Sequence, residues 1–322
     1  MAEHRLTATP DTVRWGFLDA ATPPALTVAS GDVVTVETVS GGPDHLPPPG
    51  FHVPPEMHAI HARAERMLPG HILTGPVAVE GAMPGDVLEV RIRAIDLRCD
   101  WGWNMIRPPL GALPDDFDTG RVLTMPLDLD RRVAPLPWGG ELPLAPFFGV
   151  MGVAPPAERG RVTSLVPGDF GGNLDLKELV PGARLFLPVL TPGANFSCGD
   201  GHAAQGDGEV CVTAIETGLR GTFELILRRD LSLTAPRAET PTHLIAIGLD
   251  PDLNRAMEQA LRAMIRWLGE SAGMAAADAY SLCSLAADLR ITQVVNQTRG
   301  VHCMLPRAVL PPGAAAAAGF AD

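Results

Sequence analysis

The chain has 322 residues, of which 46% are hydrophobic, and its formal net charge is −12. This length and apolar content supply a sizeable core, which excludes a disordered chain, and an acidic balance without a basic stripe excludes nucleic acid as a partner. No apolar run approaches the roughly 20 residues that cross a bilayer, and the amino terminus lacks a signal-like segment, so we expect a cytoplasmic protein away from membranes.

Apolar runs of strand length recur between residues 25 and 249, separated by Gly-Asp or Pro-Gly turns. The clearest runs cover residues 25–28, 33–36, 87–92, 185–189 and 222–227. Segments 68–82 and 180–194 also match each other at a constant offset. The match indicates two related β halves, residues 1–165 and 166–248, although Pro-Gly turns also recur by chance.

The hydrophobic period changes after residue 250. Asp250 or Asp252 can cap a helix with apolar residues at helical spacing, which we expect to end at Gly269. A second helix is expected over 275–287 and a strand over 289–295. We therefore predict a mainly β fold, sandwich-like or barrel-like, with an α+β carboxy-terminal part over 249–310 that contains a helical hairpin. A loose tail should cover 311–322.

Residues 193–209 are the most informative segment, because they hold five glycines among ionisable and amide side chains. Glycine is expected where the backbone turns sharply or approaches a ligand closely. The polar residues between the glycines are of the types that bind metals and move protons: Asp200, His202, Gln205, Asp207 and Glu209. A polar Gly-Asp turn is the alternative interpretation of this spacing.

Two further polar residues precede this segment. Asn173 and Asp175 alternate after a Gly-Gly pair, so an extended backbone would place both side chains on one face. In the alternative, Asp175 caps a turn over 176–179. The segment that contains five of the nine histidines, residues 45–71, is proline-rich and is expected to be an exposed loop, with His71 as the candidate site residue and His61 a distant second.

The five cysteines are widely spaced and form no CxxC pair, so reduced thiols are expected rather than disulfides or a cysteine-rich zinc site. Cys198 lies within the main segment, but its ionisable neighbours are mostly acidic and would not stabilise a thiolate. A serine nucleophile is equally disfavoured, because the chain has no Gly-x-Ser-x-Gly motif.

Three ordered motifs resemble the acetamidase/formamidase family of amide hydrolases. The first is Thr-Gly-Pro-Val-Ala-Val-Glu-Gly-Ala with Pro-Gly-Asp-Val-Leu, over residues 74–88. The second joins Gly-Gly-Asn-Leu-Asp at 171–175 to the segment 193–216, and the third covers 291–302. The resemblance spans about residues 10 to 310 and implies a β-rich fold, cleavage of short aliphatic amides such as formamide or acetamide, and a homo-oligomer.

Within this resemblance we assign roles to individual residues. A divalent cation, with Zn²⁺ as the expected ion, would activate a water and polarise the amide carbonyl. Glu209 would take the proton of the water and return it to the departing nitrogen, and Asn173 would donate a hydrogen bond to the oxyanion. The metal ligands are predicted to be His71, Asp175, His202 and Asp207, with Asp200 in the catalytic set and Gln205, Trp103 and His302 lining the substrate site.

Two alternatives remain at this point. The fold could carry an enzyme for a larger or cyclic C–N substrate, because the segment 41–70 departs from the family motif. It could also be a non-catalytic β protein that holds Ca²⁺ or a small ligand structurally, since carboxylate oxygens suit calcium. Imidazole is a poor calcium ligand, so His202 weighs against this second alternative.

Overall fold

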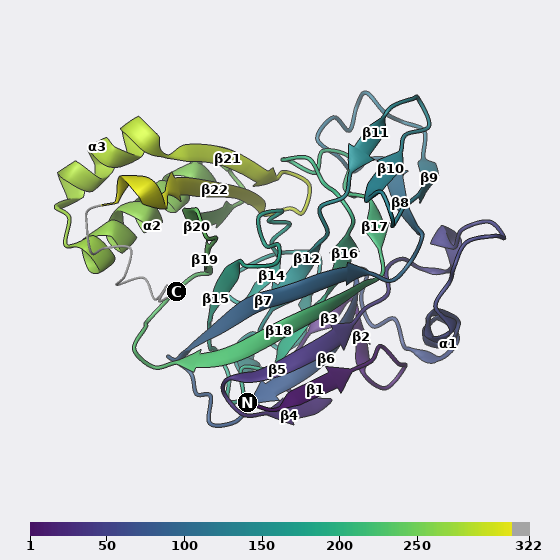
Figure 1. The fold of residues 1–322 in the computed structure, drawn as a ribbon, viewed down its shortest axis with the longest axis horizontal. Coiled ribbons are helices and arrows are strands. Elements are labelled where there is room, and N and C mark those ends of the chain that lie inside the picture. The colour runs from purple at the N-terminus through teal and green to yellow at the C-terminus, as the bar shows by residue number, and fades with distance from the viewer. Residues whose placement is uncertain (311–322) are drawn as a thin grey trace.

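The computed structural model describes residues 1–310, and the predicted tail, 311–322, lies outside the described residues. Two large β-sheets face each other across one apolar core (Figure 1). In residues 1–310 the first sheet has nine strands, in the order β1 (Glu3–Leu6), β5 (Asp32–Glu37), β18 (Leu219–Arg228), β7 (Val87–Leu97), β15 (Arg184–Pro188), β19 (Arg237–Glu239), β20 (His243–Asp250), β22 (Arg299–Pro306) and β21 (Asp288–Gln293).

The second sheet carries the segments that the sequence marks as a site. Its main path runs β14 (Gly171–Asn173), β12 (Phe147–Gly152), β16 (Phe196–His202), β17 (Glu216–Thr217), β8 (Trp101–Ile106) and β9 (Arg121–Pro126). Strand β6 (Ile72–Val79) also pairs with β16, and β2 (Val13–Trp15) and β4 (Leu26–Val28) pair with β6. Two small ribbons complete the strands, β10 (Val133–Pro135) with β11 (Glu141–Pro143) and β3 (Phe17–Leu18) with β13 (Val162–Thr163).

The predicted mainly β fold is confirmed, and its strands follow from alternating apolar residues. In β5, Val34 and Val36 are fully buried, and they share a core cluster with Val150 of β12 and Phe196 of β16. Both sheets take strands from either side of residue 165, so the predicted halves interleave. The matching segments fall on β6 and β15, in different sheets. The boundaries at 165 and 248 stay a prediction.

The carboxy-terminal part forms a helical layer on the end of the first sheet, seen in yellow-green in Figure 1. Helix α2 (Leu253–Ala272) begins after Asp252, whose carboxylate accepts hydrogen bonds from the backbone N–H groups of residues 254 and 255. Such a cap is worth about 1 kcal/mol. The expected end at Gly269 is wrong: the helix continues to Ala272, because Gly273 adopts the left-handed cap with φ +64°. Helix α3 (Ala276–Ala286) completes the predicted hairpin.

The segment 45–71 is not simply an exposed loop, which corrects the sequence interpretation. It contains helix α1 (Pro55–Arg63), which buries Met57 and Ile60 against the edge of the second sheet. A short 3-10 helix, η1 (Pro43–His45), precedes α1. Two more 3-10 turns are η2 (Ala157–Arg159) and η3 (Arg307–Val309). Proline at the first positions of η1 and α1 is compatible with helix starts, which explains how a proline-rich segment becomes helical.

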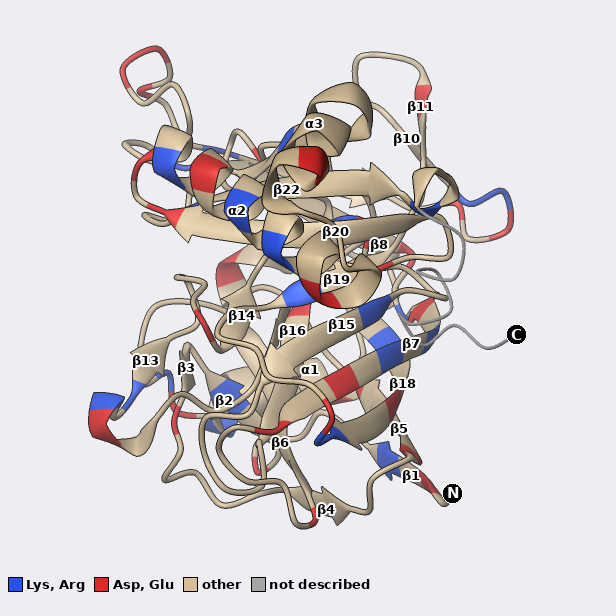
Figure 2. Ribbon diagram, turned by 90° about the vertical axis from the view of Figure 1, so that its left-hand side faces the viewer, with Lys and Arg blue, Asp and Glu red and all other residues tan. Residues whose placement is uncertain are grey.

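Charge is distributed without a dominant sign on the face in Figure 2. Acidic and basic residues are interspersed there, and α2 carries both Arg255 and Glu258 on its exposed side. None of the helices described over residues 1–310 is long and apolar enough to span a membrane.

Candidate active site

Five ionisable side chains meet at the centre of the second sheet, and all are buried. Asp200 and His202 lie on β16, Glu216 lies opposite His202 on β17, Asp175 follows β14, and Glu209 comes from the loop after β16. One candidate metal-binding group contains Asp175, Asp200 and His202, whose ligand atoms lie within 4.8 Å of one another. A second group joins His202 to Glu209 and Glu216 within the same limit.

The backbone is shaped to bring these side chains together. Asp175, Asp200 and Glu209 all have positive φ, at 51°, 56° and 45°, which is uncommon for residues other than glycine. Gly149 on β12 provides the space, because a Cβ there would lie 2.5 Å from Asp200 Oδ2 and 2.7 Å from Asp175 Oδ1. Glycine is therefore needed at 149 to leave room for the acidic groups.

Gln205 fixes the orientation of the His202 ring. Its Nε2 donates to the carbonyl of Asp175 at 2.9 Å, so its Oε1 is left to accept from His202 Nδ1, also at 2.9 Å. With the proton on Nδ1, the Nε2 lone pair of neutral His202 faces carboxylates, 3.1 Å from Glu216 Oε1 and 3.3 Å from Asp200 Oδ2. Neither contact is a hydrogen bond. Only a cation between these atoms, a proton or a metal ion, makes this arrangement favourable.

The donor set fits a divalent metal. Asp175 Oδ1 and His202 Nε2 are buried and have no hydrogen-bond partner among residues 1–310, whereas the other oxygen of Asp175 accepts from Asn296 Nδ2 at 2.6 Å. Metal-binding residues commonly use one atom for the ion and another for such an orienting hydrogen bond. A mixture of imidazole and carboxylate ligands suits zinc and similar ions.

Burial and mutual charge shift the pKa values of this cluster. Burial, and then the charge of Asp200, raises the pKa of Asp175 to about 7. Burial likewise raises the pKa of Glu216 to about 8, and with the charge of Asp175 it raises the pKa of Glu209 well above its usual range. The pKa of Asp200 is lowered: burial would raise it, but the charges of His71 and His202 outweigh burial. The pKa of His202 is raised: burial would lower it, but the charges of Glu216 and Asp200 outweigh burial.

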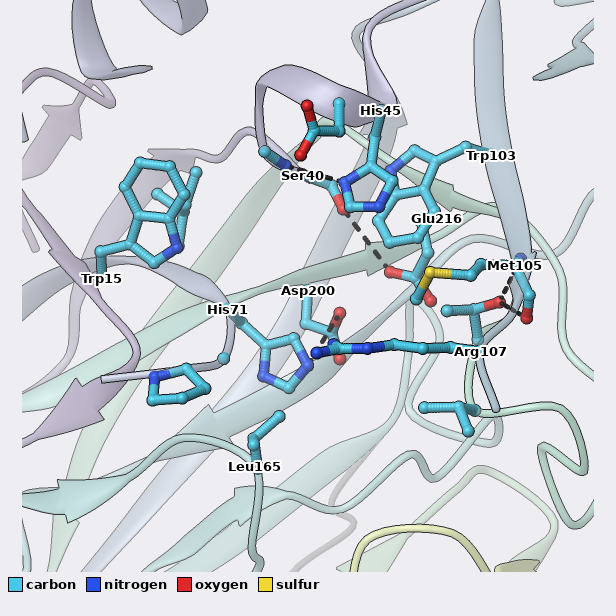
Figure 3. A pocket seen from close by; sticks show the side chains of 18 of the residues that line it. Trp15, Ser40, His45, His71, Trp103, Met105, Arg107, Leu165, Asp200 and Glu216 are labelled. Carbon is cyan, nitrogen blue, oxygen red and sulfur yellow. Dashed lines mark hydrogen bonds and ion pairs between the residues drawn. The ribbon is translucent and has the colours of Figure 1, made fainter. Parts of the chain in front are cut away.

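A cavity of about 160 Å³ opens beside the cluster. Asp200, Glu209 and Glu216 line it, as do the predicted residues His71, Asn173 and Trp103. Figure 3 shows His71 turned toward Asp200, and its Nε2 lies 3.6 Å from Asp200 Oδ1 while its Nδ1 donates to the Ser164 carbonyl at 3.2 Å. Asn173 Nδ2 donates to the Leu165 carbonyl at 3.2 Å, and its Oδ1 lacks a hydrogen bond within the described chain.

Five predicted site residues do not line this cavity, and two of them, Asp175 and His202, belong to the cluster beside it. Gln205 orients His202 and lines a neighbouring cavity. Asp207 forms an ion pair with Lys177 at 2.8 Å and belongs to a separate group with Glu178 and the fully buried His302. That group lies where the loop meets the end of β21, since Gly208 exchanges backbone hydrogen bonds with residues 292 and 294. The structure thus does not bring Asp207 or His302 to the main cluster.

The structure adds residues that the sequence interpretation left out. Glu216 joins the cluster because β17 pairs with β16, and Asn296 reaches Asp175 from the late motif. His45 stacks on Trp103, with ring centroids 4.0 Å apart. Cys198 is fully buried within the core, and burial raises the pKa of its thiol, which agrees with its predicted exclusion as a nucleophile.

A buried cluster of carboxylates and imidazole with shifted pKa values beside a cavity is typical of an enzyme active site. The family model described as the Acetamidase/Formamidase family matches residues 13–161 and 157–311, and the chain therefore belongs to this family, as the motifs predicted. Two matches in succession also agree with the internal similarity between the two parts of the chain.

Named relatives agree with this assignment. A crystal structure of acetamidase from Bacillus halodurans is 30% identical with a TM-score of 0.81, covering 94% of this chain and 97% of that one. An acetamidase structure from Yersinia enterocolitica is 28% identical with a TM-score of 0.84, covering 96% and 93%. The formamidase of Methylophilus methylotrophus is 28% identical over 194 residues, 44% of this chain and 47% of the relative. The matched region thus spans about half the length of that curated relative.

Proposed function

We propose that this protein hydrolyses an amide bond to a carboxylic acid and ammonia with the help of a divalent cation, most simply Zn²⁺. The observation that carries the proposal is the Nε2 atom of His202, which faces two buried carboxylates without a hydrogen bond. Membership of the acetamidase/formamidase family supports the class of reaction. The structures named acetamidase support it further, because they cover nearly the whole chain.

The cation would be held by Asp175, Asp200 and His202, which offer one ligand atom each within 4.8 Å. When bound, such an ion supplies a Lewis acid that lowers the pKa of water and polarises a carbonyl oxygen. His71 would be a further ligand on the cavity side, because its Nδ1–H is committed to Ser164 and the lone pair of its Nε2 faces the Asp200 carboxylate. Asp207 is not needed as a ligand in this arrangement.

Glu209 is the proposed proton carrier, because its carboxyl group lines the cavity at the edge of the cluster. It takes a proton from the attacking water at a carboxylate oxygen, and the C–O bond forms at the amide carbon. It then gives that proton to the nitrogen as the C–N bond breaks, since an amide anion is a very poor leaving group. Burial raises its pKa, which suits a group that must hold the proton between these steps.

Asn173 is placed to bind the reacting amide at the wall of the cavity. One N–H of its side chain is used by Leu165, which leaves the second N–H for the developing oxyanion. Its oxygen, which has no partner among the described residues, can accept from the amide NH₂ of the substrate. Both contacts would fix the orientation of the amide group relative to the attacking water.

The proposal is tested by measuring ammonia release from formamide, acetamide and larger amides, with bound metal quantified in the same sample. We expect turnover by wild type, and loss of both metal and activity in Asp200→Asn. Asp169→Asn is the matched control, because Asp169 forms only an exposed ion pair with Arg159 in the described chain. Stoichiometric metal with silence across the amides, and unfolding when the metal is removed, would instead indicate a structural ion and contradict the proposal.

A further inference from the structure

The cavity beside the cluster is larger than the smallest amides need. Its volume is about 160 Å³, and a cavity of about 150 Å³ accommodates a benzene ring. Formamide and acetamide are much smaller than benzene and would leave most of this space to water. Small ligands bind best where they bury most of their surface, so the volume favours a larger acyl group.

Two opposite walls of the cavity are aromatic. Trp15 stands on one side, and the stacked pair of His45 and Trp103 stands on the other, as Figure 3 shows. The planes of that pair differ by only 12°, and Trp15 and Trp103 are 6% and 7% exposed, so the walls are held in place by their own packing. Aromatic faces bind planar rings through offset stacking or edge contacts, and each such pair adds to the burial of apolar area.

The rim of the cavity is cationic, whereas its floor is acidic. Arg107 follows β8 and lines the cavity, and across residues 1–310 its guanidinium makes no hydrogen bond or ion pair. Arg66 also lines the rim, where its guanidinium lies 5.7 Å from the centroid of the Trp15 ring. Asp44 lines the cavity as well, and neither arginine forms an ion pair with a carboxylate among residues 1–310.

The imidazole of His45 lies within reach of both guanidinium charges. Burial lowers its pKa first, Asp44 opposes that change, and the charges of Arg107 and Arg66 lower it further. The ring is therefore neutral at pH 7 and acts as an aromatic wall rather than as a third cation. A ligand that reaches from the acidic floor to the rim would pass this wall and end beside Arg107.

Resting on the proposed amide hydrolysis, we propose that the substrate is an amide that carries a carboxylate on the far side of a planar ring. The amide would lie at the acidic floor, the ring between Trp15 and the His45–Trp103 pair, and the carboxylate against Arg107. Arginine suits this role, because its planar fork matches a carboxylate with two parallel hydrogen bonds. Arg107 is thus a specificity-determining residue, and the reaction at the floor does not require it.

The test compares ammonia release from 4-carbamoylbenzoate with that from the neutral 4-methylbenzamide. We expect kcat/KM to be at least about tenfold higher for the carboxylate, since a hydrogen bond to a charged group is worth that factor or more. Arg107→Ala should remove this preference by lowering kcat/KM for 4-carbamoylbenzoate far more than for 4-methylbenzamide, and Arg107→Lys should retain part of it. Arg266→Ala, on the exposed side of α2 and far along the chain from the cavity, is the matched control.

Three results would overturn this inference while the proposed function stands. They are equal kcat/KM for the two ring amides, an undiminished preference in Arg107→Ala, and turnover of formamide, acetamide or the open-chain succinamate above that of both ring amides. The absence of ammonia from every amide, with metal bound, would overturn the proposed function itself and this inference with it. A KM for 4-carbamoylbenzoate below that for 4-methylbenzamide would support the inference, if this difference is lost in Arg107→Ala and kept in Arg266→Ala.

Discussion

Asn296 and Asp175 lie 121 positions apart in sequence, yet Asn296 Nδ2 donates to Asp175 Oδ2 at 2.6 Å in the buried centre of the molecule. Gln293 holds the Asn296 segment in turn, since its Oε1 accepts from the backbone N–H groups of residues 295 and 296. The end of β21 thus reaches into the site of the second sheet. The carboxy-terminal layer therefore positions a proposed metal ligand as well as packing on the first sheet.

Replacing Asn296 should weaken the site without unfolding the protein. A buried hydrogen bond to a charged group contributes about 1.5 to 3 kcal/mol, so Asn296→Ala should lower kcat/KM and metal affinity by about 10- to 100-fold. Asn296→Asp should be worse, because it places a second carboxylate against Asp175. Both are measured by metal titration and initial rates. Arg299→Ala, at an exposed position on β22, is the control, and equal metal affinity in all variants would contradict this role.

Gly149 should tolerate no side chain. The added Cβ of Gly149→Ala would lie 2.5 Å from Asp200 Oδ2 and 2.7 Å from His202 Cε1, so the ligands must move. A displacement of about 1 Å costs about 100-fold in rate. Gly269→Ala is the matched control, because its Cβ meets nothing closer than 3.6 Å and alanine favours the interior of α2. Retention of metal and activity in Gly149→Ala would refute the arrangement described.

Glu209→Gln should separate proton transfer from metal binding. The amide side chain cannot accept the proton of water, so kcat should fall by about 10²- to 10⁴-fold. The ligands Asp175, Asp200 and His202 are unchanged, so the metal content measured by atomic emission should stay near that of wild type. A Glu209→Gln enzyme that loses its metal would show that Glu209 is a ligand, and one that keeps its kcat would exclude it as the proton carrier.

Metal binding should strengthen as pH rises. In the metal-free protein the pKa of Asp175 is raised to about 7 and that of Glu216 to about 8, so a cation must displace protons below these values. Carboxyl groups whose pKa is raised on folding stabilise the folded state fully below pH 4 and lose that contribution as pH rises through 7 and 8. The metal-free Tm should thus fall between pH 5 and pH 8.5, and the increase in Tm on adding Zn²⁺ should be larger at pH 8.5. A larger increase at pH 6 would contradict this linkage.

The local pattern of residues predicted the strands and helices well, because buried apolar residues recur with the spacing of a strand or a helix, and this spacing is visible in the sequence. Asp252 and the apolar spacing after it predicted α2, but its end could not be fixed, since Gly269 and Gly273 are both plausible caps by sequence. The segment 45–71 misled the interpretation for a related reason. Its prolines indicate irregular structure, although Pro55 occupies the first turn of α1, where proline is tolerated.

The site was predictable where its residues are close in sequence and not where strands bring them together. Asp200 and His202 share β16 and were found from their segment. Glu216 was missed, because its place opposite His202 depends on the register of β17 with β16. Asp207 looked equivalent to Asp200 by composition, yet the loop turns it outward to Lys177. Spacing alone gives no information on which side of a glycine-rich loop each carboxylate points to.

The most direct test of the central claim is removal and return of the metal in one preparation. Protein freed of divalent ions by a chelator should stay folded by circular dichroism and release no ammonia from any amide that the untreated enzyme turns over. Titration with Zn²⁺ should restore ammonia release in proportion to bound metal, with a break at one ion per chain. Full activity in the metal-free protein would contradict the account.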